Sequence, residues 1–244
     1  MVIFLASSLA AKSLFESVVK VIKALDNKSK RNYLKAARQE LSHIVGRNVD
    51  SLSEQEILRA TAETASENFV DGVFAPLFWM GAGYFFWTFS PFSPGPLALS
   101  WAFKASSTMD SMLGYREGKL KWLGTASARL DDVLTYIPCR LVVFSLPLVS
   151  RPFKEFPSLI LSSFRDGSRD LSPNSGLSEA IFAHCANVKM GGENIYNRKK
   201  VLKPMLAINS NEPSQKGIYK ILNIGFRLEV SWLISLFFLS VFFK

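Results

Sequence analysis

The longest apolar stretch of the sequence, residues 72–103, contains no charged residue. A helix needs about 20 such residues to cross the hydrocarbon core of a bilayer, so this stretch is the strongest membrane signal in the chain. Glycines and prolines interrupt it, most densely in "SPFSPGP". These breaks predict one helix from about Val70 to Phe89, then a turn, and then a second helix that extends as far as Tyr115.

A second apolar run covers residues 133–150, where Arg140 is the only charged residue. The run contains Pro138 and Pro147, which a membrane helix tolerates when neighbouring helices satisfy the backbone groups that proline leaves unpaired. It is therefore either a kinked membrane span or a buried helix, and we favour the span.

Both ends of the chain also predict helices. The last run, residues 230–243, is long enough to cross a membrane if Phe226 and Leu228 join it and Lys244 extends its ammonium group to the membrane surface. Residues 1–25 indicate the remains of a membrane helix that continues into an amphipathic helix. The apolar stripe of that amphipathic helix consists of Leu14, Val18, Val21 and Leu25.

Polar segments at residues 26–68, 116–132 and 151–227 separate these runs. In the first of them, Ser53 and Glu56 have the spacing of a capping box and predict the start of a helix. The third is rich in Gly, Pro and Asn, which predicts ordered loops. The whole pattern predicts an all-α, polytopic integral membrane protein with a single domain over residues 1–244, in which polar loops and interfacial helices form one site.

Composition supports membrane residence and an anionic partner. Hydrophobic residues make up 48% of the chain, which is high for a soluble domain, and the formal net charge is +9. This charge suits lipid headgroups, a nucleotide or a phosphorylated metabolite. Nucleic acid is disfavoured, because most Phe and Trp residues lie in uncharged runs. Cys139 and Cys185 lie far apart, which excludes a disulfide framework and a CxxC metal motif.

Glu63, Glu67 and Asp71 recur every four residues and lead into the longest apolar run. This spacing places them on one helix face, where like charges repel each other. A solvated acidic face is one explanation. An ionised group at membrane depth is costly and usually functional, so Asp71 favours contact with a metal ion or a substrate, and the three carboxylates could present their oxygens to Mg²⁺. Asn68 adds a neutral ligand or donor to the same face.

Two acidic groups at the edges of apolar runs each allow two interpretations. Asp110 either caps a helix end or faces the site. Arg129, Asp131 and Asp132 form either an ordinary ion pair at the membrane surface or a site for a phosphate and its metal ion.

Anion binding and proton transfer have further candidates. The string "RDGSRDLSPNSG" combines Arg165 and Arg169 with glycines that permit tight turns, and a helix that follows it would point backbone amides at a phosphate. His43 is either a general base or a hydrogen-bonded structural residue.

Six groups of residues carry a family resemblance between about Tyr33 and Met205. They are "LSHIVGR", "TAE" with "ENFVDGVFAPLFW", "DSMLGYR", "ARLDD" with "YIP", "SPNSG" and "GGENIY", in this order. With these strings the sequence resembles the CobD/CbiB family of cobalamin biosynthesis, the membrane-embedded adenosylcobinamide-phosphate synthases. Ser107 and Leu177 depart from the pattern, in which Asn and Trp are expected. The resemblance also implies a further N-terminal membrane segment that this sequence lacks.

The resemblance implies an ATP-dependent amide ligase in the cell membrane, with its active face toward the cytoplasm. Such an enzyme joins the propionate carboxylate of adenosylcobyric acid to aminopropanol or its O-phosphate and gives adenosylcobinamide or its phosphate. A carboxylate needs activation before an amine can attack it, and phosphorylation by ATP with Mg²⁺ is the simplest route. The alternative is a corrinoid-handling membrane transporter or scaffold.

The resemblance further implies partners and roles. Membrane lipid is an expected partner, and a homo-oligomer or an assembly with other membrane proteins of cobalamin synthesis stays open. The implied catalytic residues are Glu63, Glu67, Asp110 and His43, with the proton handled by Asp110 or His43. The implied metal ligands are Glu63, Glu67 and Asp71. The implied substrate and phosphate ligands are Asn68, Arg129, Asp131, Asp132, Arg165, Arg169, Asn174 and Glu179.

Overall fold

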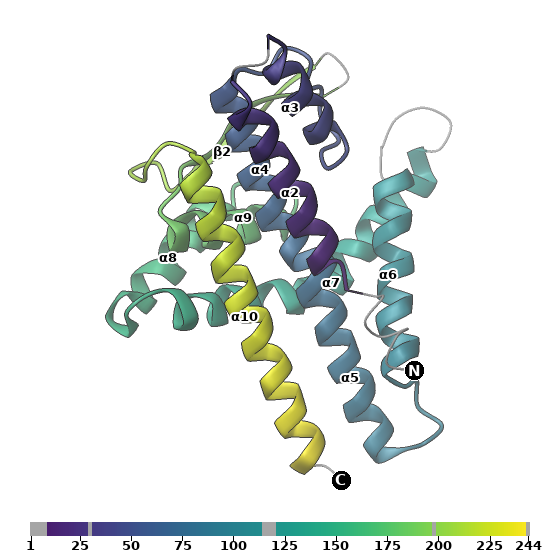
Figure 1. Ribbon diagram of the computed structural model, residues 1–244. Helices are drawn as coiled ribbons and strands as arrows, with labels where there is room; N and C mark the ends of the chain where they lie inside the picture. Colours follow the sequence, from purple (N-terminus) through teal and green to yellow (C-terminus); the bar gives the residue numbers. More distant parts are fainter. Residues whose placement is uncertain (1–8, 29–30, 114–120, 197–198, 243–244) are drawn as a thin grey trace.

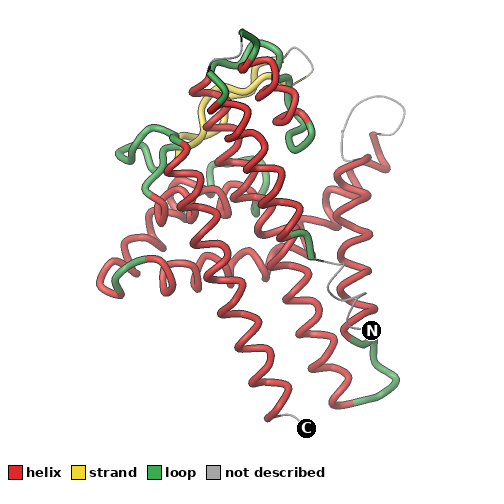
Figure 2. The backbone as a smooth tube through the Cα atoms, viewed as in Figure 1, coloured by secondary structure: helices red, strands yellow, loops and turns green. Residues whose placement is uncertain are grey.

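The computed structural model describes residues 9–28, 31–113, 121–196 and 199–242. Over these residues the chain is an all-α membrane protein with one small β-hairpin (Figures 1 and 2). The helices in chain order are α2 Ala11–Asp26, α3 Tyr33–Ser42, α4 Glu54–Phe69, the π-turn η1 Val70–Phe74, α5 Ala75–Phe89, α6 Pro96–Leu113, α7 Lys121–Ser150, the short η3 Phe153–Glu155, α8 Phe156–Gly167, α9 Ser175–Ala186 and α10 Gln215–Phe242. The strands β1 Met190–Tyr196 and β2 Lys199–Leu206 precede α10.

Helices α4 and α5 form one continuous rod, joined by η1. The predicted capping box is confirmed, because the Ser53 hydroxyl accepts a hydrogen bond from the Glu56 amide and the Glu56 carboxylate accepts one from the Ser53 amide. The prediction that a separate helix begins near Val70 was wrong. No Gly or Pro lies between Glu54 and Val70, so nothing in the sequence stops the helix there.

The π-turn has a cause in the sequence. Pro76 has no amide hydrogen to donate to the carbonyl four residues earlier, which belongs to Gly72. That carbonyl accepts a hydrogen bond from the backbone amide of Ala10, at 2.8 Å. A Cβ atom on Gly72 would lie 3.1 Å from the Cβ of Ala10, so the glycine permits this close approach. The start of α2 is thereby held against the junction of α4 and α5.

Three of the described helices are long and apolar enough to cross a membrane: Glu54–Phe89, Trp122–Ser150 and Gln215–Phe242. In Figure 1, α5 and α10 extend together toward the lower end, and α7 passes across them. Indole N–H groups connect the three, since Trp79 donates to the Leu134 carbonyl and Trp232 to the Ser145 hydroxyl. Helix α7 begins at Lys121, well before residue 133. It therefore includes twelve residues of the predicted polar segment 116–132.

The segment 151–227 was expected to hold ordered loops, and it does so at residues 168–174 and 207–214, but the string "VKMGGENIY" forms mostly a strand. The segment also contains α8, α9, the antiparallel hairpin of β1 and β2, and the first part of α10. Short strands with glycine, such as "MGGENIY", lack the regular alternation that predicts a strand from sequence. Asp166 on α8 joins these elements, because it pairs with His184 at 2.9 Å and accepts a hydrogen bond from the Ala207 amide.

The amphipathic helix near the amino terminus is confirmed. Its predicted apolar stripe faces the core, and Leu14, Val18, Val21 and Leu25 are all buried. The membrane helix expected before it falls on residues 1–8, outside the described part of the chain, as does Tyr115 at the end of the second predicted helix. Large apolar side chains are exposed on α5 and on the second half of α10, which suits lipid contact; they include Phe85, Phe86, Trp87, Phe237 and Phe238.

The contact between α10 and α4 gives a first prediction. A Cβ atom on Gly225 would lie 2.4 Å from the Phe69 ring, and that ring is itself stacked on Phe182. We expect Gly225→Leu to lower the free energy of unfolding in detergent by about 1–3 kcal/mol, because overpacking forces side chains off their rotamers. Phe226→Leu, at an exposed neighbouring position, is the control. Equal melting temperatures for the two variants would show that α10 does not pack on α4 at this point.

Candidate functional site

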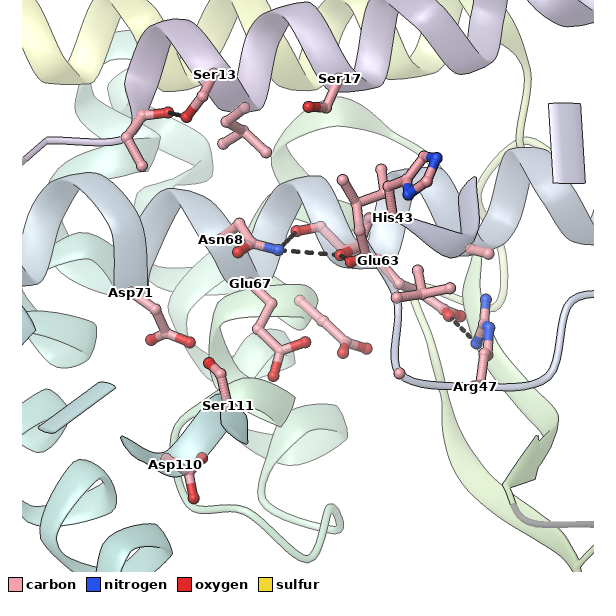
Figure 3. Close-up of a pocket in the computed structure, with 18 of the residues that line it drawn as sticks. Ser13, Ser17, His43, Arg47, Glu63, Glu67, Asn68, Asp71, Asp110 and Ser111 are labelled. Carbon is pink, nitrogen blue, oxygen red and sulfur yellow. Dashed lines mark hydrogen bonds and ion pairs between the residues drawn. The ribbon is translucent and has the colours of Figure 1, made fainter. Parts of the chain in front are cut away.

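Two cavities meet beside α4. They belong to the polar half of the molecule, by which we mean α2, α3, α4, the hairpin and the loop before α9. The larger has a volume of about 560 Å³ and lies between α2, α4, the loop after α3 and α6 (Figure 3). The smaller has a volume of about 210 Å³ and lies between η1, α7 and the loop before α9. Both are lined by Glu67, Asp71 and Asp110, so these three acidic side chains separate one cavity from the other.

The acidic wall comes from two elements that are distant in the sequence. Glu67 and Asp71 project from α4 and η1 toward α6, where Ser111 points back at them and Asp110 lies next to it (Figure 3). Glu63 also lines the larger cavity, so the shared helix face predicted from the four-residue spacing is present in the structure. The π-turn places Asp71 where the polar rod becomes apolar, and π-turns of this kind are frequent at functional sites.

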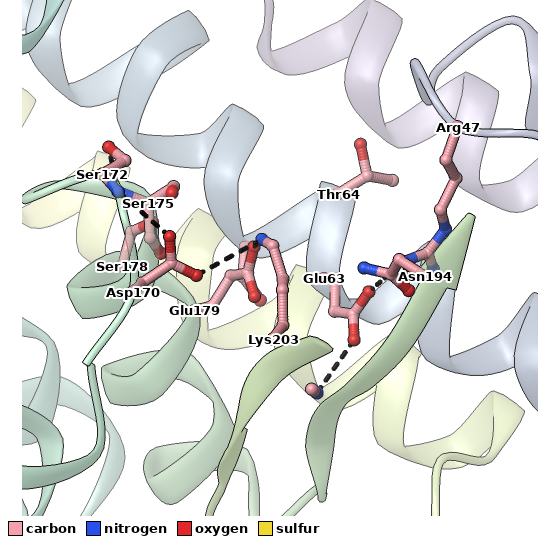
Figure 4. A network of polar contacts seen from close by, with 12 residues as sticks. Arg47, Glu63, Thr64, Asp170, Ser172, Ser175, Ser178, Glu179, Asn194 and Lys203 are labelled. Atoms are coloured by element: carbon pink, nitrogen blue, oxygen red, sulfur yellow. Dashed lines mark hydrogen bonds and ion pairs between the residues drawn. The ribbon is translucent and has the colours of Figure 1, made fainter. Parts of the chain in front are cut away.

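Glu63 is held by a buried network. One carboxylate oxygen accepts a hydrogen bond from Arg47 at 2.7 Å, and the other accepts the backbone amide of Gly191 at 2.9 Å (Figure 4). Arg47 also donates to the side-chain carbonyl of Asn194. The exposed fractions of Arg47, Glu63 and Asn194 are 8%, 4% and 3%, so the network is shielded from bulk solvent. The network holds the hairpin and the loop after α3 against α4.

Arg47 retains buried hydrogen-bonding capacity. Its Nε and Nη2 atoms are buried and have no partner among the described residues, although the side chain lines the larger cavity. A buried guanidinium donor without a partner costs free energy, which an anion in the cavity would recover.

Lys203 supplies a second fixed cation. It extends from β2 and donates to Glu179 at 2.7 Å, with Asp170 at 3.7 Å (Figure 4). Burial alone would lower the pKa of Lys203, but the carboxylates of Glu179, Glu67 and Asp170 outweigh it and raise that pKa. Lys203 therefore keeps its charge at neutral pH and lies in the wall of the larger cavity.

The smaller cavity is lined by acids and small polar groups. Asp131 and Asp132 enter it from α7, and Ser172 and Asn174 enter from the loop before α9. Asn174 donates to the Asp132 backbone carbonyl at 2.8 Å. It also accepts from Arg140 at 2.6 Å, so the single charged residue of the predicted run 133–150 anchors this loop. Atom Oδ1 of Asp131 is buried and has no hydrogen-bond partner among the described residues.

The structure brings most of the residues named from the sequence to these cavities. Asn68, Asp110 and Glu179 line the larger one, together with the acids of α4, and Asp131, Asp132 and Asn174 line the smaller one. The Asn68 amide hydrogen-bonds to the carbonyl and hydroxyl of Thr64 on its own helix. His43 lines the larger cavity from an exposed position near Arg47 (Figure 3).

Three arginines named from the sequence lie elsewhere. Arg129, Arg165 and Arg169 are exposed and line neither cavity. Arg165 pairs with its neighbour Asp166 at 3.1 Å. Two other cations, Arg47 and Lys203, occupy the cavity wall instead. Arg47 could have been found from the sequence, because it ends the quoted string "LSHIVGR". Lys203 could not, because its position depends on a hairpin that the sequence pattern did not predict.

Two of the acids offer oxygen donors of the kind that bind metal ions. Among the described residues, no three His, Cys, Asp or Glu side chains form a ready-made metal site. Mg²⁺ is usually bound by one or two carboxylates, with water and substrate phosphates completing six positions. Asp71 and the unpartnered oxygen of Asp131 line the same small cavity and provide hard donors of this kind.

Comparison with known proteins identifies similar sequences. The family model described as "CobD/Cbib protein" matches residues 1–224. A "Cobalamin biosynthesis protein CobD" of Synechocystis sp. is 46% identical over 84% of this chain and 56% of that protein. Proteins of the same name from Clostridium perfringens and Halalkalibacterium halodurans are 38% and 36% identical, over 88% and 98% of this chain and 64% and 71% of their own lengths. The chain thus spans little more than half to about two thirds of these relatives. No solved structure matches it.

The buried network around Glu63 gives a second prediction. We expect Arg47→Met to lower the free energy of unfolding by roughly 3–5 kcal/mol, because the change leaves a buried carboxylate without its closest cation. Lys200→Met is the control, since its ion pair with Glu193 is exposed and contributes less than about 1 kcal/mol. Chemical unfolding in detergent measures both. If the two variants lose the same small amount, Glu63 is not held by a buried ion pair.

Proposed function

Because the chain belongs to the CobD/CbiB family, we propose that it serves cobalamin biosynthesis as an ATP-dependent amide ligase. The acid substrate is the propionate carboxylate of adenosylcobyric acid, and the nucleophile is aminopropanol or its O-phosphate. The observation that supports this best is one cavity with both kinds of charge. Arg47 and Lys203 line it together with the acidic wall of Glu67, Asp71 and Asp110.

The two kinds of charge match the two chemical requirements of the reaction. A carboxylate is a poor acyl donor until a phosphoryl group converts one of its oxygens into part of a leaving group. Transfer of that phosphoryl group requires positioning and neutralisation of negative charge. Arg47 offers buried donors and Lys203 a permanent positive charge to the reacting anions. Mg²⁺, when bound by Asp71 and Asp131, would neutralise the phosphates of ATP.

The cavity dimensions restrict how the substrates enter. A volume of about 560 Å³ is in the range that encloses a single drug-sized ligand. A corrin ring with its adenosyl group is larger than such a ligand, so only the propionate arm enters while the ring stays at the opening. ATP is a cytoplasmic metabolite, and we therefore place the polar half of the molecule on the cytoplasmic side of the cell membrane.

The proposal gives a third prediction, for the purified chain in detergent. With ATP, Mg²⁺, adenosylcobyric acid and aminopropanol phosphate, we expect formation of the amide. We expect Asp71→Asn and Asp131→Asn each to reduce the rate of amide formation at least about a hundredfold, because each removes a carboxylate that would hold the charge-neutralising Mg²⁺. Higher Mg²⁺ concentrations should recover part of the activity. Asp50→Asn, at an exposed loop position, is the control.

One outcome of this assay would contradict the proposal. If the unmodified chain forms no amide and releases no phosphate, while vesicles that contain it transport a corrinoid, the ligase proposal is wrong and a transporter is favoured.

A fourth prediction concerns Lys203. We expect Lys203→Met to reduce kcat/KM for amide formation at least about a hundredfold, because it removes a buried cation from the cavity wall. Lys200→Met, three residues earlier on the same strand, should keep the activity of the unmodified chain since its ammonium is exposed. Equal activities of these two variants would exclude a role of Lys203 in holding the reacting anions.

A further inference from the structure

Resting on the function proposed above, we propose that Glu179 accepts the proton that the substrate amine loses, while Lys203 remains a fixed cation beside it. An amine such as aminopropanol carries a proton at neutral pH and cannot attack a carbonyl carbon until that proton is removed. A base in the larger cavity is therefore required by the chemistry of the nucleophile.

The position of Glu179 suits this role. It projects from α9 and is 1% exposed, and it lines the larger cavity. Its Oε1 atom accepts the hydrogen bond from Lys203, whereas its Oε2 atom is buried with no hydrogen-bond partner among the described residues (Figure 4). One oxygen thus fixes the side chain, and the other is free to receive a hydrogen bond from a bound ammonium group.

Other polar side chains of the cavity are less suited. Both oxygens of Glu63 are already engaged, by Arg47 and by the Gly191 amide. His43 is exposed, so water competes for its ring nitrogens. Glu179 does not line the smaller cavity, in which Asp71 and Asp131 would hold the metal ion. Of the two proposed metal ligands, Asp131 lines only the smaller cavity, whereas Asp71 lines both cavities and belongs to the wall between them.

The charges that face Glu179 tune its affinity for a proton. Burial raises the pKa of its carboxyl group to about 8, Lys203 on β2 opposes this shift, and Glu63 and Glu67 on α4 add to it. Asp170, in the loop before α9, faces Lys203 from the other side. A base is most effective when its pKa lies near the working pH. The ionised form accepts the proton, so the rate should rise as the pH passes about 8.

The step balances in atoms and charge. The ammonium nitrogen gives one proton to Oε2 of Glu179 and becomes a free amine. Its electron pair forms the C–N bond with the acyl phosphate carbon, and the C–O bond to phosphate breaks with its electron pair on the phosphate. The nitrogen then loses a second proton to the departing phosphate, which leaves the neutral amide. Glu179 returns its proton to water.

Hydroxylamine separates this step from the activation step. It is uncharged at neutral pH, so it traps an acyl phosphate as a hydroxamate without help from a base. The experiment uses the complete chain in detergent and compares hydroxamate formation with amide formation from aminopropanol, each with ATP, Mg²⁺ and adenosylcobyric acid between pH 6 and pH 9.5. The variants are Glu179→Gln, Glu179→Asp and, as a matched control, Glu212→Gln, whose carboxylate is exposed.

We expect Glu179→Gln to lose about a hundredfold or more in amide formation at pH 7 while hydroxamate formation changes by less than about threefold. Its pH profile should lose the inflection near 8 and rise only as the free amine accumulates. Glu179→Asp should form the amide at a rate between those of Glu179→Gln and the unmodified chain. Glu212→Gln should form it as fast as the unmodified chain does. Hydroxamate formation also reports that the variant is folded.

Three results would overturn the inference. Equal loss of both products in Glu179→Gln would show a structural role or a role in activation. An unchanged amide rate would show that another group takes the proton. If the unmodified chain forms neither hydroxamate nor amide, the ligase proposal itself fails, and the base assignment fails with it.

Discussion

The fold is governed by the need to keep carboxylates at the point where a polar helix becomes a lipid-facing one. A buried ion without a partner costs several kcal/mol, so each acid requires a cation, a hydrogen bond or water. Two of them are neutralised within the protein, Glu63 by Arg47 and Glu179 by Lys203. Those cations come from the loop after α3 and from the hairpin, which explains why these polar elements cover α4 and not α5.

The π-turn couples this electrostatic arrangement to the backbone. Pro76 leaves the Gly72 carbonyl without its helical donor, and the Ala10 amide supplies one. The same contact brings Ser13 and Ser17 of α2 to the larger cavity, on the side opposite α6 (Figure 3). A proline in the membrane helix thus determines both the position of Asp71 and the position of the helix that closes the cavity.

The sequence predicted features that depend on local patterns and missed those that depend on distant pairing. The four-residue spacing from Glu63 to Asp71 and the capping box at Ser53 were sufficient to predict a shared helix face and a helix start. The hairpin was missed because Gly191 and Gly192, both with positive φ, interrupt its alternation. Lys203 was missed for the same reason. Arg165 was chosen for its neighbouring glycines, but its guanidinium pairs with Asp166, whose carboxylate is held in place by the distant residues His184 and Ala207.

The charge balance of the larger cavity links the two proposals. Five acidic side chains line it, those of Glu63, Glu67, Asp71, Asp110 and Glu179, and even with Glu179 protonated they outnumber the two permanent cations Arg47 and Lys203. This excess of negative charge attracts cations, namely Mg²⁺ and the ammonium group of the amine. The reaction converts the ammonium group into a neutral amide and also gives ADP and phosphate, so the amide product lacks the charge that drew the amine into the cavity. The same imbalance that favours binding of the amine therefore gives the amide no comparable affinity.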